Sequence, residues 1–135
     1  MNIPFVYRVR EVIKVVDGDT IDVAIDLGFD ISITKNVRLA GIDTPESRTK
    51  DLHEKKLGLE AKEYLKKSLD TDKEVLIKTE LPDSTEKYGR ILGWLYVDGV
   101  CINTKMIDEG YAWGYDGGTK VKDFAILESK RALAS

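Results

Sequence analysis

A short stretch of the sequence, residues 37–46, brings one cation and two carboxylates close together. Its first half alternates apolar and polar side chains, as a strand entering a core does, and its second half breaks at Pro45 because proline cannot continue a strand ladder. Arg38, Asp43 and Glu46 are therefore expected where a rigid strand becomes an open loop. An arginine beside an acidic pair suits a phosphate held next to a metal ion, although a strand-end salt bridge would give the same pattern.

Two further aspartates, Asp17 and Asp19, flank Gly18 in a pattern typical of a hairpin turn. On its own this pattern predicts only a turn. The functional alternative is that Asp19 points inward from a strand end and supplies an oxygen ligand to calcium, a hard cation that accepts carboxylates from separate loops. A zinc site is not expected, because the sequence holds one histidine, His53, and one cysteine, with no cluster of the two types.

The third group is Lys87-Tyr88-Gly89-Arg90, in which glycine permits a tight bend and Arg90 begins a strand. A solvated hairpin with a surface arginine would explain this group without any function. The functional interpretation is a second guanidinium that holds the same phosphate as Arg38, since fixed cations stabilise charge that develops on phosphate oxygens. Arginine keeps its charge and binds two oxygens at once, which lysine cannot do.

The surrounding sequence predicts strands that would carry these groups at their ends. Alternating apolar and polar side chains, rich in β-branched and aromatic types, predict strands over 5–16, 20–27, 30–39, 74–79 and 90–97. Turn signals separate several of them. A set of five strands favours a small closed barrel of the oligonucleotide/oligosaccharide-binding type (OB-fold), with a split α+β sheet as the alternative.

Helices are expected in three places. Apolar residues at spacings of three and four predict a helix over 57–69. Asn103 is expected to cap a short helix that Gly110 ends. A terminal helix is predicted over 121–133, with inward contacts from Phe124, Leu127 and either Ala132 or Leu133. The charged segment 46–58 is interpreted as a mobile surface loop, and 81–88 as a second loop.

Size and composition fit one compact domain over residues 1–135, with 42% hydrophobic residues. No apolar run is long enough to span a membrane, and a monomer is the default expectation. The sequence starts without a signal peptide, so we expect a cytoplasmic protein, or a secreted one if a leader has been removed.

Cys101, the single cysteine, excludes an internal disulfide and is expected to be buried and inert. With a net charge of −3, phosphate binding must come from locally placed arginines and lysines together with any metal cation.

The three groups, in this order, resemble the signature segments of the staphylococcal nuclease (thermonuclease) family. The segments that carry the resemblance are Asp17-Gly18-Asp19-Thr20, Val37-Arg38-Leu39 with Asp43-Thr44-Pro45-Glu46, and Lys87-Tyr88-Gly89-Arg90. The likeness begins at about Val12 and continues through Asp98-Gly99, Asn103, Glu109-Gly110 and Ala112. Relative to the family, the hairpin around Gly28 is somewhat longer and the connection around Gly117 is shorter.

The resemblance implies a mainly β, α+β fold, namely a five-stranded OB-fold barrel with three α-helices. It also implies a calcium-dependent endonuclease that hydrolyses both DNA and RNA through attack by a metal-activated water and leaves 3′-phosphate ends. Arg38 and Arg90 would hold the scissile phosphate, and Glu46 would act as the general base or position the water. The implied metal ligands are Asp19, Asp43 and the carbonyl of Thr44.

Aromatic residues supply candidate contacts to the bases. Lys87 and Tyr88 match the family pattern, and Trp113 and Tyr115 lie where the family places base-stacking tyrosines. Stacking tolerates any base and suits a single-stranded substrate, which we expect to be preferred. Core packing is the alternative for Trp113.

Two other functions stay open at this point. One is an OB-fold module that binds nucleic acid without cutting it, and the other is an enzyme that hydrolyses a small phosphodiester. A pure binder has no need for Asp19, Asp43 and Glu46 beside paired arginines, which favours an enzyme. Internal cleavage of a circular single strand would separate a polymer substrate from a small one.

Overall fold

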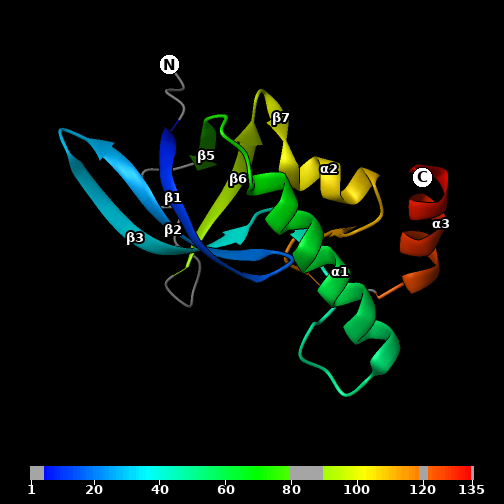
Figure 1. Ribbon diagram of the computed structural model, residues 1–135. Coiled ribbons are helices and arrows are strands. Elements are labelled where there is room, and N and C mark those ends of the chain that lie inside the picture. Colours follow the sequence, from blue (N-terminus) through cyan, green and yellow to red (C-terminus); the bar gives the residue numbers. More distant parts are fainter. Residues whose placement is uncertain (1–4, 80–89, 119–121, 135) are drawn as a thin grey trace.

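The computed structural model describes residues 5–79, 90–118 and 122–134, and over these ranges the chain forms a barrel flanked by helices (Figure 1). The barrel strands are β1 (Phe5–Asp17), β2 (Thr20–Gly28), β3 (Ile31–Leu39), β5 (Val75–Thr79) and β6 (Ile91–Val97). Short strands are β4 (Ile42–Asp43), β7 (Val100–Cys101) and β8 (Trp113–Gly114). The helices are α1 (Leu52–Leu69), α2 (Ile102–Asp108) and α3 (Phe124–Ala134).

The barrel closes where β3 meets β6. The strand order is β3-β2-β1-β5-β6-β7, and an additional pairing joins β3 to β6. That pairing is parallel and sets Val37 beside Ile91, Arg38 beside Leu92 and Leu39 beside Gly93. The other barrel pairings are antiparallel. The first three predicted strands pair in sequence order, the closed OB-type barrel is confirmed, and the split sheet is wrong.

Strand β1 is long enough to serve two neighbours because it bends. Its first residues, Phe5–Arg8, pair with β5, and the remainder pairs with β2. The β1–β2 register shifts at three places, after Val9, Val12 and Val15. Such bulges insert an extra residue on one strand and increase its local twist. These bulges let β1 curl around the barrel and pair with both β5 and β2.

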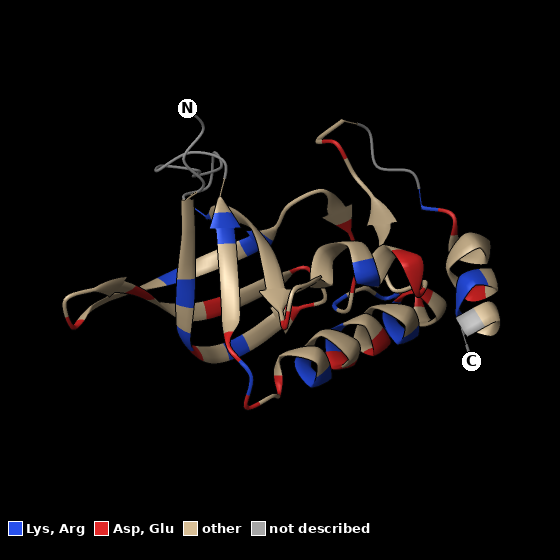
Figure 2. Cartoon of the chain, turned by 90° about the horizontal axis from the view of Figure 1, so that it is seen from above, with Lys and Arg blue, Asp and Glu red and all other residues tan. Residues whose placement is uncertain are grey.

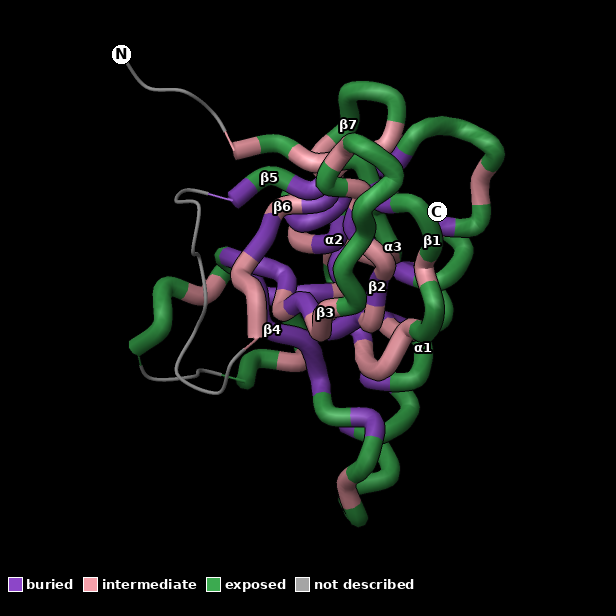
Figure 3. The backbone as a smooth tube through the Cα atoms, turned by 90° about the vertical axis from the view of Figure 1, so that its left-hand side faces the viewer, coloured by how far each residue is buried: buried purple, intermediate pink, exposed green. Residues whose placement is uncertain are grey.

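The core fills the barrel and continues under α1 and α2. Inward-facing strand residues and one face of α1 are almost inaccessible to solvent, and Figure 3 shows buried segments gathered at the centre. Leu65 on α1 and Met106 on α2 are completely buried. The alternation of the strands and the apolar stripe of α1 therefore meet in one cluster, as the sequence predicted.

Helix α1 begins earlier than the apolar stripe predicted. The Asp51 side chain accepts hydrogen bonds from the backbone N–H groups of His53 and Glu54, which caps the first turn. Leu57 and Gly58 are buried. The interpretation of 46–58 as a mobile surface loop is therefore wrong from residue 52 onward, because an aspartate cap starts the helix within the charged segment.

The predicted C-terminal end of α2 is confirmed, and its predicted N-terminal cap is wrong. Gly110 follows the helix with φ +84°, a conformation that glycine adopts without strain. The N-cap position, however, is taken by Cys101, which is half-buried rather than buried. Asn103 lies within the first turn, and its side chain is buried. The prediction that Asn103 caps the helix is wrong because its amide is used in tertiary hydrogen bonds.

The terminal helix is confirmed, starting at Phe124. Leu127 is fully buried, whereas Ala132 and Leu133 are exposed, so the predicted inward contact from either of them is wrong. The buried apolar contact of α3 is therefore made by Leu127, while polar contacts come from its second half, where Arg131 donates to the Gly110 carbonyl at 2.8 Å and pairs with Glu60 at 3.0 Å. The predicted loop 81–88 lies outside the described residues.

Candidate active site

Arg38 lies at the centre of the candidate site, near the end of β3. Its side chain is only 11% exposed, and it lies between two carboxylates. Nη1 is 3.4 Å from Asp19 Oδ2, and Nη2 is 3.8 Å from Asp43 Oδ1. Nη1 also donates a hydrogen bond of 2.9 Å to the carbonyl of Leu39. The guanidinium is therefore held in a fixed orientation between two acidic groups, one from the β1–β2 turn and one from β4.

Asp19 is positioned by the tight turn between β1 and β2. The Thr20 hydroxyl donates to Asp19 Oδ1 at 2.9 Å, and the Leu39 N–H donates to the Asp19 carbonyl at 2.8 Å. A Cβ on Gly18 would lie 2.9 Å from the Cβ of Ala61 and 3.1 Å from the Thr44 side chain. Only glycine allows this close approach, so the turn sits against both α1 and the loop that follows β4.

Asp43 enters the site from the short pairing of β4 with β8, where it lies opposite Trp113. Asp43 and Thr44 are each 5% exposed, and Pro45 is fully buried. This part of the predicted strand-to-loop segment is thus a rigid, buried wall. The structure brings Asp19, Arg38 and Asp43 together, as the sequence predicted, although they come from separate turns and strands.

Arg90 immediately precedes β6 and is half-buried. Because Arg38 pairs with Leu92 in the parallel ladder, and alternate residues share a face, Arg90 is on the same face of the barrel as Arg38. Ordinary strand spacing places the Cα atoms of the two arginines roughly 8 Å apart. Barrel closure thus brings together two arginines that are distant in the sequence.

Glu46 is exposed, but its backbone is fixed on two sides. Its N–H donates to Glu54 Oε2 at 3.0 Å, and the neighbouring Ser47 hydroxyl donates to Asp17. A Cβ on Gly58 of α1 would lie 2.6 Å from the carbonyl carbon and oxygen of Glu46. The Glu46 backbone therefore lies directly against α1, while its carboxylate faces solvent beside the buried wall.

Glu54 and Lys122 lie near Glu46, and the sequence analysis assigned no role in the site to either residue. Glu54 is 7% exposed, and its Oε2 also accepts a hydrogen bond of 2.9 Å from Lys122 Nζ. Glu54 lies three residues after the N-cap residue Asp51, the position whose side chain in a capping box bonds back to the cap residue. Glu54 instead contacts Glu46, and nothing in the local sequence indicates that partner.

The aromatic candidates divide into three cases. Trp113 is 9% exposed, donates its indole N–H to the Asp123 carbonyl at 3.0 Å and packs edge-on against Phe124. These contacts favour the packing alternative, and its base-stacking role stays a prediction. Tyr115 is half-buried with its hydroxyl bound to the Gly118 carbonyl, so contact with a base also stays a prediction. Lys87 and Tyr88 lie outside the described residues.

The donor set fits a calcium ion by its chemistry. Asp19, Asp43 and the Thr44 carbonyl are all oxygen donors, which a hard cation prefers, and they come from adjacent loops. Among the described residues, no three histidine, cysteine or acidic side chains lie together as a metal cluster. Two carboxylates and a carbonyl leave room for water in the coordination shell, which calcium accepts.

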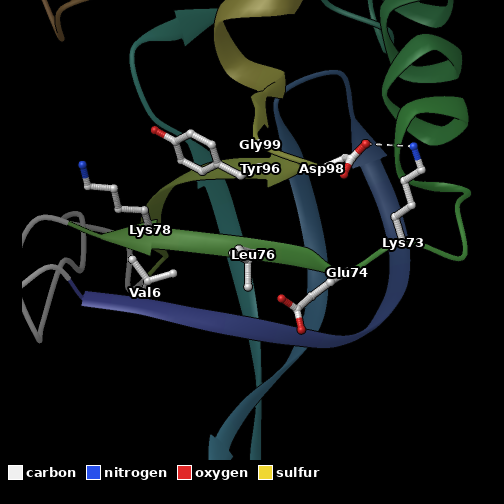
Figure 4. A pocket seen from close by; sticks show the side chains of 8 residues that line it. All are labelled: Val6, Lys73, Glu74, Leu76, Lys78, Tyr96, Asp98 and Gly99. Atoms are coloured by element: carbon white, nitrogen blue, oxygen red, sulfur yellow. Dashed lines mark hydrogen bonds and ion pairs between the residues drawn. The ribbon is translucent and has the colours of Figure 1, made fainter.

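A separate hollow lies on the outside of β1, β5 and β6 and encloses about 520 Å³ (Figure 4). Val6, Leu76 and Tyr96 form its wall, and Lys73 pairs with Asp98 at 2.9 Å on its rim. None of the predicted site residues lines it. The candidate site is instead the region around Arg38, where the side chains of Asp19 and Asp43 approach the guanidinium.

Comparison with known proteins gives consistent results. A protein-family model described as staphylococcal nuclease homologue matches residues 36–132. An uncharacterized protein of Bacillus anthracis is 38% identical over 101 residues, which are 75% of this chain and 44% of that protein. A thermonuclease of Staphylococcus hyicus is 32% identical over 102 residues, 76% of this chain and 56% of that protein. The prophage-derived endonuclease YokF of Bacillus subtilis is 32% identical over 113 residues, 82% of this chain and 36% of that protein.

The chain spans between about a third and just over half of the length of these curated relatives. The match begins just before Arg38 and ends within α3, so it covers most of the candidate site. None of the helices in the described part of the chain has the length and hydrophobicity needed to cross a bilayer.

Proposed function

This chain belongs to the staphylococcal nuclease family, and from that premise we propose that it is a calcium-dependent endonuclease acting on DNA and RNA. One observation carries the proposal. The Arg38 guanidinium lies 3.4 Å from Asp19 and 3.8 Å from Asp43, on the barrel face where Arg90 also lies. A cation fixed beside two carboxylates is the arrangement that phosphate and a divalent ion would share.

The two arginines bind and orient the phosphodiester. Each guanidinium donates two parallel hydrogen bonds to phosphate oxygens, and together they stabilise the charge that develops as the bond to the leaving oxygen lengthens. Arg38 is held by the Leu39 carbonyl, so little reorganisation is needed when substrate arrives. Because the arginines contact only the phosphates of the nucleic acid, which DNA and RNA share, either polymer can be the substrate.

Asp19, Asp43 and the Thr44 carbonyl would hold the calcium ion, which when bound would supply positive charge against the phosphate and lower the pKa of nearby water. Glu46 lies one residue beyond Pro45, with its carboxylate exposed to solvent. It accepts the proton of the attacking water, or orients that water, at a carboxylate oxygen. As the water oxygen bonds to phosphorus, the bond from phosphorus to the 5′-oxygen breaks, and that oxygen takes a proton from solvent, which gives a 3′-phosphate end and a 5′-hydroxyl end.

Calcium removal tests the proposal directly. Labelled single-stranded DNA and RNA are expected to be cut internally in the presence of calcium and to remain intact with a calcium chelator. Without the cation the two carboxylates repel the phosphate, so cleavage is expected to fall at least about a hundredfold. Gel analysis of a circular single strand, followed by end-group analysis of the products, measures both internal cutting and the 3′-phosphate.

A non-catalytic OB-fold module is the alternative, and the same samples separate the two. Retention of the strand on the protein without cleavage at any calcium concentration would support the module and contradict the nuclease. Slower cutting of duplex than of single-stranded DNA is expected, because stacking on aromatic side chains needs unpaired bases.

Glu46→Gln is expected to reduce kcat about a hundredfold while leaving calcium affinity within about twofold, because loss of a general base removes proton transfer without removing a ligand. Single-turnover cleavage and calorimetric calcium titration provide the two measurements. Glu63→Gln, an exposed change on α1 away from the site, is the matched control. Loss of calcium binding in Glu46→Gln would make this residue a ligand rather than a base.

A further inference from the structure

The carboxylate of Glu54, in the first turn of α1, joins two segments that are distant in the sequence. Its Oε2 accepts the backbone N–H of Glu46 at 3.0 Å and the Nζ of Lys122 at 2.9 Å. The Glu54 side chain is 9% exposed and that of Lys122 is 37% exposed. A buried carboxylate remains charged at low cost only when a cation and hydrogen bonds accompany it, and Lys122 is that cation.

Lys122 is delivered by a segment that is itself firmly attached. The next residue, Asp123, accepts the Trp113 indole N–H at 3.0 Å, and Phe124 packs against the Trp113 ring. Within α3, Glu128 pairs with His53 at 2.7 Å, and Figure 2 shows α3 beside the N-terminal end of α1. Trp113 therefore fixes the residues that follow Lys122, and the contact between Glu128 and His53 holds α3 at the start of α1.

Lys122 is also close to the acidic residues of the site. The hydrogen bond with Glu54 raises the pKa of the Lys122 ammonium, the charges of Glu54, Glu46 and Asp43 raise it further, and burial opposes them. The ammonium therefore lies close enough to the acidic side of the site for Glu46 and Asp43 to act on it, although its side chain is 37% exposed.

We propose that Lys122 is a positioning residue for this site, acting through Glu54 to fix the backbone of Glu46. The inference rests on the proposed function only in giving Glu46 a catalytic role. The positioning itself is a property of the folded chain and can be measured without substrate. Lys122 is not assigned any contact with the phosphate.

Lys122→Met is expected to expose the Glu46 amide. Without its cation, the Glu54 carboxylate turns toward water and releases the Glu46 N–H, so hydrogen exchange at that amide is expected to accelerate about tenfold. Under the proposed function, kcat is expected to fall about tenfold or more with KM within about twofold, since a small misplacement of a base slows the reaction without weakening binding. Lys122→Arg, which keeps the charge, is expected to restore both.

A matched control and a double-mutant cycle separate positioning from other roles. Glu128→Gln weakens a different contact at the start of α1, the one between Glu128 of α3 and His53, yet does not touch Glu46, so exchange and kcat should stay at wild-type values. If Lys122 acts through Glu54, then adding Lys122→Met to Glu54→Gln costs nothing more than Glu54→Gln alone. If Lys122 binds phosphate directly, its effect persists in that background.

The decisive experiment is residue-resolved hydrogen exchange with single-turnover cleavage for the wild type, Lys122→Met, Lys122→Arg and Glu128→Gln. Faster exchange at Glu46 with lower kcat in Lys122→Met, and recovery in Lys122→Arg, supports the proposal. Unchanged exchange at Glu46, or additive effects in the cycle with Glu54→Gln, overturns it. If no form of the protein cuts nucleic acid, the proposed function fails, whereas the exchange measurements still decide whether Lys122 positions Glu46.

Discussion

Arg38→Ala is expected to lower kcat/KM for single-stranded DNA by two to three orders of magnitude, about 3 kcal/mol of transition-state stabilisation. The guanidinium is buried between Asp19 and Asp43 and is held by the Leu39 carbonyl, so water cannot replace its fixed donors. The variant also leaves two carboxylates with no cation between them at the point where the phosphate must bind. Initial cleavage rates at saturating calcium measure the loss.

Arg8→Ala and Arg38→Lys are the controls for Arg38→Ala, because one tests loss of an arginine elsewhere and the other tests charge without the guanidinium. Arg8→Ala removes an exposed arginine that pairs with Asp26 at 2.7 Å on the outside of β1, and it should cut at the wild-type rate. Arg38→Lys keeps the charge but not the planar fork, and is expected to recover only part of the activity. Thermal unfolding checks that each variant is folded. Activity of Arg38→Ala within about threefold of the wild type would remove this residue from the mechanism.

Asn103→Ala is expected to reduce the free energy of unfolding by about 4 kcal/mol, because several buried polar groups lose their partner together. The Asn103 side chain accepts the Leu95 N–H at 2.9 Å and donates to the carbonyls of Ala40 at 2.8 Å and Gly93 at 3.1 Å. It is 2% exposed, so water cannot enter to satisfy these groups. Urea unfolding followed by tryptophan fluorescence measures the change.

Asn36→Ala is the control for Asn103. Its side-chain amide donates to Asp22 at 2.7 Å on the half-buried outer part of the β2–β3 hairpin, where water can replace the partner. We expect a loss below about 1 kcal/mol there. A similar small loss for Asn103→Ala would show that the contact between β3, β6 and α2 contributes little to barrel closure.

The strands of this barrel could be predicted because their signal is local. Alternation of side chains in β2 and in the last residues of β3 reflects one face on the core, and the Asp98-Gly99 turn shows the positive φ values, +52° and +79°, that its residue types favour. Resemblance to a known family supplied the grouping of Asp19, Arg38 and Asp43. Alternation alone gives no register between β3 and β6, since those strands lie far apart in the sequence.

The errors occurred where a tertiary partner outweighed a local rule. Asn103 has the composition of a helix cap, but its amide contacts three backbone groups of other segments. The segment 46–58 has the charge of a surface loop, but from Leu52 it is helical, and Glu54 in that helix contacts Glu46 and Lys122. Where a polar side chain has several possible hydrogen-bond partners, the packing of the folded chain determines which one it bonds. A short window of sequence does not contain that information.

The parallel pairing of β3 with β6 also determines when the site comes into existence during synthesis. A growing chain that ends before Ile91 already contains Arg38, Asp19 and Asp43, yet it lacks the strand that closes the barrel beside them. Contacts of such long sequence separation form late in folding because the intervening chain must first be ordered. The emerging polypeptide therefore cannot complete the candidate site until most of the described chain has left the ribosome.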